Sequence, residues 1–211
     1  MIFENRQDAG KKLADKVSLL KLLNPIILGL PRGGVVVASE IAKKLNTPLD
    51  VVISRKIGAP NQSELAIGAV SEGEVLVLDN TIIKRLGVSK SELKFMIDKE
   101  KKEVKKRVEL FRDDKSLMNL RNKTVLIVDD GLATGMTALA AIKTVKKLHP
   151  FKIIFATPIC ALNPVEDVVK EVEMVICLEK SDNFMAIGQW YENFNQVSDE
   201  EVIYLLMKKY D

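Results

Sequence analysis

The feature of the sequence that most constrains the fold is a strand, a loop and a helix that follow one another without a gap from residue 125. Residues 125–128 form a continuous apolar run, typical of a buried parallel strand, and residues 137–148 have the apolar spacing and alanine content of a helix. The loop between them lies at a strand's carboxyl end and a helix's amino end. Unpaired backbone N–H groups and the positive end of the helix dipole face outward there, so the sequence predicts an anion site.

The small and hydroxyl-bearing residues of this loop suit a phosphate group. Gly131 and Gly135 allow the main chain to approach an anion without a Cβ atom in between. The hydroxyl groups of Thr134 and Thr137 can donate further hydrogen bonds to the same anion. We therefore expect the loop to hold a phosphate.

Two adjacent acids, Asp129 and Asp130, open the loop and would repel a phosphate. We expect them to accept hydrogen bonds from ribose hydroxyls, directly or through a hydrated Mg²⁺ ion. The structural alternative is a strand, turn and helix with an acidic N-cap, but paired acids followed by Thr-Gly-x-Thr serve no packing purpose. A Walker-type loop needs a Lys after the second glycine, and a dinucleotide fingerprint needs Gly-x-Gly-x-x-Gly; the sequence has neither here.

The order of residues in this loop resembles the phosphoribosyl pyrophosphate (PRPP) signature of type I phosphoribosyltransferases. The shared pattern is an apolar strand, Asp-Asp, two residues, Ala-Thr-Gly, one residue and Thr. The resemblance implies that Asp129 and Asp130 hold the ribose and a metal ion. It also implies that the remaining loop residues bind PRPP: Gly131, Leu132, Ala133, Thr134, Gly135, Met136 and Thr137.

A second strand, loop and helix occurs earlier in the chain, with a strand at residues 26–30 and a helix at 35–45. The loop between them resembles the pyrophosphate-binding loop of the same family, where an arginine clamps phosphate oxygens and glycines present backbone amides. Alone, Arg-Gly-Gly also fits a tight turn with a surface arginine. The family resemblance further implies a strained or cis peptide near the arginine. The loop residues are Pro31, Arg32, Gly33 and Gly34.

The resemblance implies that residues 56–79 form an antiparallel flap over the reaction centre. The sequence predicts two strands around a turn at Gly73. Lys56, which follows a strand expected at residues 48–54, could reach the pyrophosphate; its alternative is a solvated strand end. Glu64 is an acid of the flap to which the sequence gives no definite role.

A helical insertion is predicted at about residues 89–114, capped by Ser89 or Ser91. Its many lysines are interleaved with acids, which indicates a solvated helix with i,i+4 ion pairs; an RNA-contacting face is the alternative interpretation. The chain also resembles a branch of uncharacterised predicted phosphoribosyltransferases, from about residue 26 to residue 197. The shared phrases are Leu-Pro-Arg-Gly-Gly, Arg-Lys-Ile-Gly-Ala-Pro, Glu-Leu-Ala-Ile-Gly-Ala-Val and Val-Asp-Asp-Gly-Leu-Ala-Thr-Gly. It leaves open the roles of Glu103, Arg107 and Arg112.

Further strands are expected at residues 152–159 and 174–178, with a helix between them at 164–172. The alternation of strands and helices indicates an α/β fold with an open, doubly wound, mostly parallel sheet. The resemblance implies that residues 180–198 form a small hood over the acceptor side of the cleft. Aromatic residues concentrate in this segment and could stack on a planar base, although a packed C-terminal cap explains them equally well. The candidate acceptor-binding residues are Phe184, Trp190 and Tyr191.

Composition agrees with one domain over residues 1–211. The chain is 47% hydrophobic, enough for one core, and its net charge of +3 does not by itself predict nucleic-acid binding. Cys160 and Cys177 lie in apolar, strand-like surroundings, as reduced core residues do in a cytoplasmic protein. We also expect no signal peptide and no membrane span.

The resemblance implies Mg²⁺-dependent transfer of the 5-phosphoribosyl group from PRPP to a nitrogenous base, with release of pyrophosphate, as in nucleotide salvage. The catalytic residues would be Arg32, Lys56, Asp129 and Asp130, and the enzyme would be a homodimer. Ala133 stands where 6-oxopurine transferases carry an acid that acts as the base, which argues against those acceptors and leaves adenine as one candidate. The alternatives are a PRPP-sensing regulator or RNA-binding protein without turnover and, more weakly, a phosphosugar hydrolase.

Overall fold

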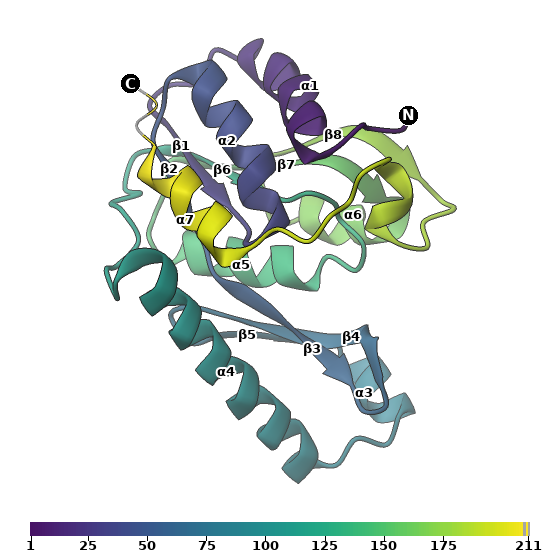
Figure 1. Ribbon diagram of the computed structural model, residues 1–211. Coiled ribbons are helices and arrows are strands. Elements are labelled where there is room, and N and C mark those ends of the chain that lie inside the picture. The colour runs from purple at the N-terminus through teal and green to yellow at the C-terminus, as the bar shows by residue number, and fades with distance from the viewer. Residues whose placement is uncertain (209, 211) are drawn as a thin grey trace.

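A five-stranded parallel sheet with strand order β2-β1-β6-β7-β8 forms the centre of the protein (Figure 1). The structure is a computed structural model that describes residues 1–208 and 210. Apolar runs make up these strands, and most of their side chains are buried because helices cover both faces. This arrangement confirms the predicted open, doubly wound α/β fold. The strands are β1 (Pro25–Gly29), β2 (Leu49–Val51), β6 (Thr124–Val128), β7 (Lys152–Ala161) and β8 (Met174–Ser181).

Two pairs of helices cover the two faces of this sheet (Figure 1). One face packs against α1 and α2, whose buried residues join Ile27, Leu126 and Ile154 in a single apolar cluster. The other face packs against α5 and α6, with Phe155 and Ile127 among the buried residues. The helices are α1 (Arg6–Ser18), α2 (Gly33–Leu45), α5 (Met136–Lys146) and α6 (Leu162–Val169).

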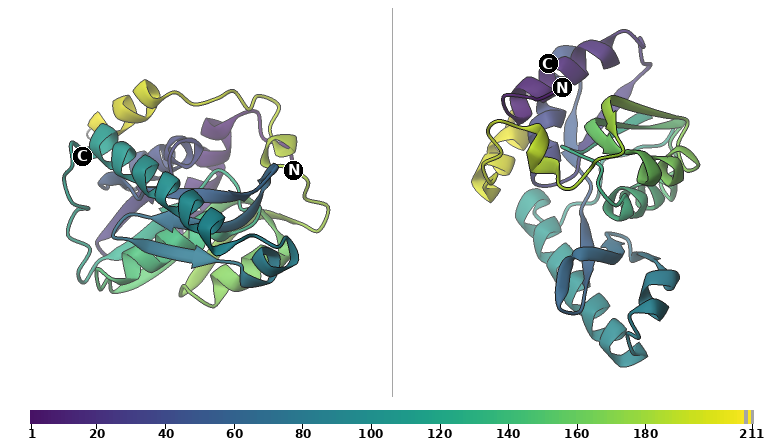
Figure 2. Two further views of the ribbon diagram at one scale, coloured as in Figure 1. Left: turned by 90° about the horizontal axis from the view of Figure 1, so that it is seen from below. Right: turned by 90° about the vertical axis from the view of Figure 1, so that its right-hand side faces the viewer.

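A second sheet of three antiparallel strands extends away from the first (Figure 2). Helix α5 lies between the two sheets and contacts both, while α4 runs across the antiparallel sheet. The predicted turn is present at Gly73, whose φ is +66°. The elements of this part are β3 (Ser54–Ala59), β4 (Gln62–Ser71), β5 (Val75–Leu78), α3 (Asn80–Arg85) and α4 (Lys90–Arg112).

Helix α4 begins at a capping box. The side chain of Ser89 accepts from the backbone N–H of Glu92, and the Glu92 carboxylate accepts from the backbone N–H of Ser89. The predicted ion pairs along the helix include Lys94 with Asp98 at 2.7 Å. No helix in the described part of the chain, α4 included, combines the length and apolar character that a membrane crossing requires.

Two local expectations need correction, and one helix was not predicted. The apolar spacing of Ala9, Leu13, Val17 and Leu20 predicts a first helix over residues 5–23, but the helix ends at Ser18, because the chain turns there and Lys21 has a φ of +46°. The single strand expected at 48–54 is divided: β2 belongs to the parallel sheet, whereas Ser54 pairs with β4 in the antiparallel sheet. Helix α3 was not predicted, although Asp79 caps it by accepting from two backbone N–H groups.

The C-terminal segment returns over the first helix. It contains the short 3-10 helix η1 (Ile187–Trp190) and α7 (Asp199–Met207). A small apolar cluster joins this segment to the N-terminus, with Phe3 and Tyr191 buried and their ring centroids 5.5 Å apart. The hood segment is thus tied to the edge of α1, next to the loop that follows β6.

Phe155→Ala should destabilise the protein strongly, because this side chain of β7 is 0% exposed between the sheet and its helices. We expect a loss of about 3–5 kcal/mol in the free energy of unfolding. The matched control is Phe95→Ala on α4, where the ring is 73% exposed, with an expected change within about 0.5 kcal/mol. Urea unfolding of both variants measures the difference; equal losses would contradict the described core.

Candidate functional site

The parallel pairing of β1 with β6 brings the two predicted loops together. Gly29 pairs with Val128 at the carboxyl ends of the two strands, and the N–H of Leu30 donates to the carbonyl of Val128 at 2.8 Å. The loop after β1 therefore lies beside the loop after β6, although the two are distant in the sequence. Their joint position, at the carboxyl edge of a parallel sheet, is where α/β proteins bind ligands.

Glycines make this close approach possible. A methyl group on Gly33 would overlap Oδ2 of Asp130 and lie 2.6 Å from Nε of Arg6. A methyl group on Gly34 would lie 2.6 Å from the carbonyl oxygen of Val128 and 2.9 Å from Cα of Asp129. The peptide between Pro31 and Arg32 is cis, as the resemblance implied. The predicted pyrophosphate loop thus packs directly on the two acids of the signature.

Arg6 of α1 is a member of the site that the sequence did not reveal. Its Nε lies 2.6 Å from Oδ2 of Asp130, and both side chains are 11% exposed. Its Nη1 donates to the carbonyl of Asn195 at 2.7 Å, and its guanidinium carbon lies 3.7 Å from the ring centroid of Phe194. Arg6 therefore compensates the charge of Asp130 and connects the first helix, the signature loop and the hood segment.

The two adjacent acids have different surroundings. Asp130 is paired with Arg6, and its backbone carbonyl accepts from the Tyr191 hydroxyl at 2.6 Å. Asp129 has no such cation among the described residues. Burial of the carboxyl group and then the charge of Asp130 raise the pKa of Asp129 well above its ordinary value. Asp129 therefore has no ion-pair partner in the described part of the chain, although the N–H of Asp130 donates to its Oδ1 at 2.9 Å. A hydroxyl donor or a cation beside it would stabilise its charged form.

The signature loop is fixed by contacts at its start, whereas its later residues are more exposed. Its strand-like start is fixed to β7, because the N–H of Leu132 donates to the carbonyl of Ile159 at 2.9 Å. Gly131 is buried under Ile187 of η1, where a methyl group would come within 2.6 Å of a side-chain carbon. Gly135, with a φ of +73°, caps α5. The other residues predicted to bind PRPP are partly or fully exposed. They are Ala133, Thr134, Met136 and Thr137.

Arg32, in the predicted pyrophosphate loop, lies near arginines of two other elements. Arg32 lies 3.8 Å from a carboxylate oxygen of Asp199, the first residue of α7. Arg107 of α4 is half-buried, and burial, followed by the charge of Arg55 on β3, lowers its pKa; the charge of Arg32 acts in the same direction. Arg107 thus lies near two other arginines and near the acid Asp199, whose charge acts on its pKa in the opposite direction. Arg55 is partly balanced by Glu100, 3.0 Å away.

Lys56 lies on the antiparallel sheet and is paired with Glu64 at 3.1 Å. Both side chains line a pocket of about 340 Å³ between the β3–β4 hairpin and α4. Among the described residues, the ion-pair partner of Lys56 is thus an acid of the hairpin and not a residue of either loop. The contact between Lys56 and a pyrophosphate therefore stays a prediction.

The aromatic residues of the hood segment divide into two groups. Tyr191 is 6% exposed, and its ring stacks on Phe194 at a centroid distance of 5.0 Å. Phe184 and Trp190 stack on each other at 6.4 Å, farther along the segment. Phe194, which sequence reasoning did not select, lines a pocket of about 310 Å³ together with Arg32. Of these rings, Phe194 is the one that borders the pyrophosphate loop.

The residues present suit a Mg²⁺ ion held mainly by its substrate. In residues 1–208 and 210, no three His, Cys, Asp or Glu side chains are placed to enclose a metal. Mg²⁺ commonly keeps several waters and binds through one or two carboxylates together with substrate phosphates. Asp129, whose carboxyl group has no cationic partner in the described part of the chain, is the residue that could offer such a contact.

The fold and the two joined loops define a class of protein, the type I phosphoribosyltransferase fold with an added antiparallel sheet. The comparisons agree with this assignment. The family model described as "Phosphoribosyl transferase domain" matches residues 2–195. The chain belongs to this family, and the resemblance found in the two loop motifs is confirmed.

Relatives extend over nearly the whole chain. A crystal structure of TT1426 from Thermus thermophilus is 37% identical, with a TM-score of 0.81 and 99% coverage of both chains. A Mycobacterium tuberculosis protein named "Putative phosphoribosyl transferase Rv0571c" is 39% identical over 205 residues, which cover 97% of this chain but 46% of the relative. The chain therefore spans about half the length of the curated relatives it matches. AQ2163 from Aquifex aeolicus, at 12% identity and a TM-score of 0.53, shares the fold over 83% of this chain and 74% of its own.

Replacing the two adjacent acids should have opposite effects on stability. Asp130→Asn removes the charge that pairs with buried Arg6 and should lower the free energy of unfolding by about 3 kcal/mol. Asp129→Asn removes a carboxyl group that the fold disfavours in its charged form. This variant should be more stable than the wild type at neutral pH.

The stability difference between Asp129→Asn and the wild type should depend on pH, because the pKa of Asp129 is raised in the folded protein. Between the ordinary carboxyl pKa and the raised one, the folded protein binds more protons than the unfolded chain, so stability falls as pH rises through that window. The advantage of Asp129→Asn should therefore be small near about pH 4 and grow toward about pH 7.5. Urea unfolding across this range measures it; an advantage that shrinks with rising pH would contradict the described environment.

Proposed function

We propose that this protein transfers the 5-phosphoribosyl group of PRPP to a nitrogenous acceptor and releases pyrophosphate. The observation that carries the proposal is the contact between the loop at residues 31–34 and Asp129 and Asp130. That contact supports a single site for both ends of one donor: a phosphate at the start of α5 and a pyrophosphate at the loop after β1. The ribose would lie between them.

The chemistry assigns a role to each part of the site. The bond from the anomeric carbon to the pyrophosphate oxygen breaks, a bond from that carbon to the acceptor nitrogen forms, and the nitrogen loses its proton. The sugar acquires oxocarbenium character, as in glycoside cleavage, while negative charge grows on the pyrophosphate. Loop residues 131–137 would fix the 5-phosphate, and Asp129 and Asp130 would orient the ribose.

The leaving group would meet the positive part of the site. Arg32 and the amides of Gly33 and Gly34 are proposed to bind the pyrophosphate, with Arg107 as a further cation. Lys56 would join them if the antiparallel hairpin closes as a flap, a movement that would also exclude water. A bound Mg²⁺ ion would supply additional positive charge to the phosphate oxygens.

The acceptor is proposed to be a planar nitrogenous base other than a 6-oxopurine. Ala133 provides no carboxylate at the position where 6-oxopurine enzymes have their base, so adenine is one candidate. Phe184, Trp190 and Tyr191 remain proposed members of the acceptor side, and we add Phe194, a partly exposed ring that lines a pocket with Arg32. We further propose a homodimer in the cytoplasm that acts in nucleotide salvage.

Donor binding can be tested with hydroxyl variants. Titration calorimetry of PRPP should show Mg²⁺-dependent binding, and Thr134→Val should weaken it about tenfold through loss of a hydrogen bond to the phosphate. The matched control is Thr81→Val, an exposed threonine of α3, with unchanged affinity. If PRPP does not bind the folded protein, the proposal fails. If it binds but no acceptor in a broad panel gives pyrophosphate release, a PRPP-sensing role without turnover replaces it.

Arg107 should act on the pyrophosphate end of the donor. Arg107→Gln should weaken both PRPP and inorganic pyrophosphate at least about tenfold, because it removes a charge-assisted hydrogen-bond donor, while ribose 5-phosphate should bind unchanged. Arg121→Gln, at an exposed turn before β6, serves as the control. Equal weakening of ribose 5-phosphate would show that Arg107 acts through the fold instead of through the pyrophosphate.

A further inference from the structure

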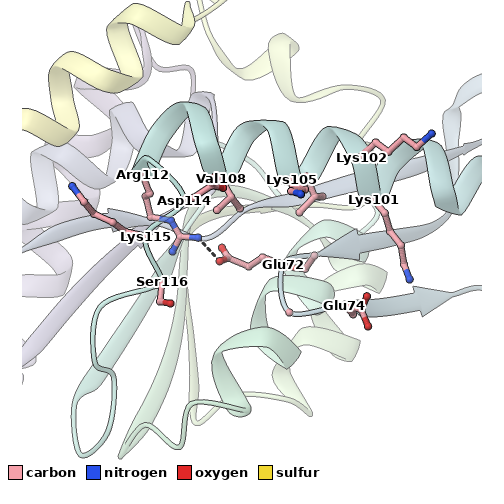
Figure 3. A pocket seen from close by; sticks show the side chains of 13 residues that line it. Glu72, Glu74, Lys101, Lys102, Lys105, Val108, Arg112, Asp114, Lys115 and Ser116 are labelled. Atoms are coloured by element: carbon pink, nitrogen blue, oxygen red, sulfur yellow. Dashed lines mark hydrogen bonds and ion pairs between the residues drawn. The ribbon is translucent and has the colours of Figure 1, made fainter.

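A pocket of about 520 Å³ lies between α4 and the turn that joins β4 to β5 (Figure 3). The turn is attached to the C-terminal part of α5, because Thr144 Oγ1 donates to the carbonyl of Glu72 at 3.0 Å and Lys147 Nζ to that of Gly73 at 3.1 Å. The signature loop adjoins the opposite end of α5, roughly 12 Å away along the helix. The pocket is therefore separate from the donor loops, and its volume suits a small molecule.

Arg112 presents buried donors in this pocket. The residue is 8% exposed, and its Nη2 donates to Glu72, whose other carboxylate oxygen accepts from the N–H of Ile53 at 2.9 Å. Its Nε and Nη1 are buried and have no hydrogen-bond partner in the part of the chain that the structure describes. Buried N–H groups without partners are costly and uncommon. These two donors of Arg112 therefore have no acceptor in the described part of the chain, although the carboxyl groups of Glu72 and Asp50 lie near the guanidinium.

Four lysine side chains also line this pocket, in addition to Arg112. Lys101, Lys102 and Lys105 line the pocket from α4, and Lys115 lines it from the segment after the helix (Figure 3). The three helix lysines form no ion pair with the described residues, in contrast to Lys94 on the same helix. Five basic and three acidic side chains line the pocket, and one of the acids, Glu72, is already engaged by Arg112. The remaining charge favours an anion.

The pocket also has an apolar side. Val104 is buried and Val108 is half-buried, and both line it beside the lysines. An inorganic anion alone would leave this apolar wall in contact with water. The combination of convergent donors and an apolar wall is typical of a site for an organic molecule that carries phosphate groups.

We propose that this pocket binds a small organic phosphate of nucleotide size, with its phosphates against Arg112, Lys101 and Lys105 and its organic part against Val104 and Val108. This site is distinct from the PRPP loops. It does not depend on whether the protein transfers a phosphoribosyl group.

The proposal is tested by calorimetric titration of ATP, used as a probe for the class, at low salt. The wild type should bind one equivalent, and the double variant Lys101→Gln, Lys105→Gln should bind at least about tenfold more weakly. The control is Lys94→Gln, Lys106→Gln, which removes the same charge from the same helix outside the pocket and should bind as the wild type does. Arg32→Gln, at the donor loop, should also leave this affinity unchanged, and adenosine should not bind.

Several results would overturn the proposal. The first is the absence of saturable ATP binding, and the second is an equal affinity of the two lysine double variants for ATP. The third is loss of ATP binding in Arg32→Gln, because that result would place ATP at the donor loop. Inorganic triphosphate that binds as tightly as ATP would exclude the organic contact. Single-stranded RNA that binds through Lys101 and Lys105 while ATP does not would identify the lysines as a nucleic-acid surface. Urea unfolding midpoints near that of the wild type ensure that all variants are folded.

Discussion

The site depends on one pairing, that of β1 with β6 in the middle of the parallel sheet. Because both strands point the same way, their carboxyl ends reach the same edge, and the chain leaves each of them as a loop that continues into a helix. Two segments that each offer backbone amides are thereby placed side by side. Neither loop alone could contact both a phosphate and the far end of a diphosphorylated sugar. The pairing therefore brings the two predicted anion loops together at one edge of the sheet.

The two adjacent acids, Asp129 and Asp130, differ in their ion-pair partners. Arg6 reaches Asp130 from the first helix, so that carboxylate is a fixed part of the framework between α1, the signature loop and the hood segment. Asp129 is left without a cation among the described residues, at a cost to the folded state. Binding sites commonly retain a buried charged group that destabilises the free protein, because the ligand supplies the missing partner. One acid thus maintains the geometry while its neighbour stays available for the ligand.

Local sequence patterns predicted the parallel sheet and both loops, because the apolar runs, the glycines and the threonines that define them are contiguous. The Ser89 cap of α4 was predictable for the same reason. What the sequence did not reveal are contacts between distant segments. Nothing near Arg6 indicates that it meets Asp130, and nothing near Phe194 indicates that it borders Arg32. The division of residues 48–54 between two sheets also depends on a distant partner, Ser71.

The place of the antiparallel sheet in the chain has a consequence for how such proteins can diversify. The chain leaves the parallel sheet after β2 and returns to it at β6, and residues 54–123 contribute no strand to the parallel ladder. This stretch holds the β3–β5 sheet and α4, with Arg55, Arg107 and the pocket around Arg112. A change in the length or composition of this stretch would leave the pairing of β1 with β6 intact, provided that its packing against α2, α5 and α7 is preserved. New ligand preferences could then arise beside an unchanged pair of loops.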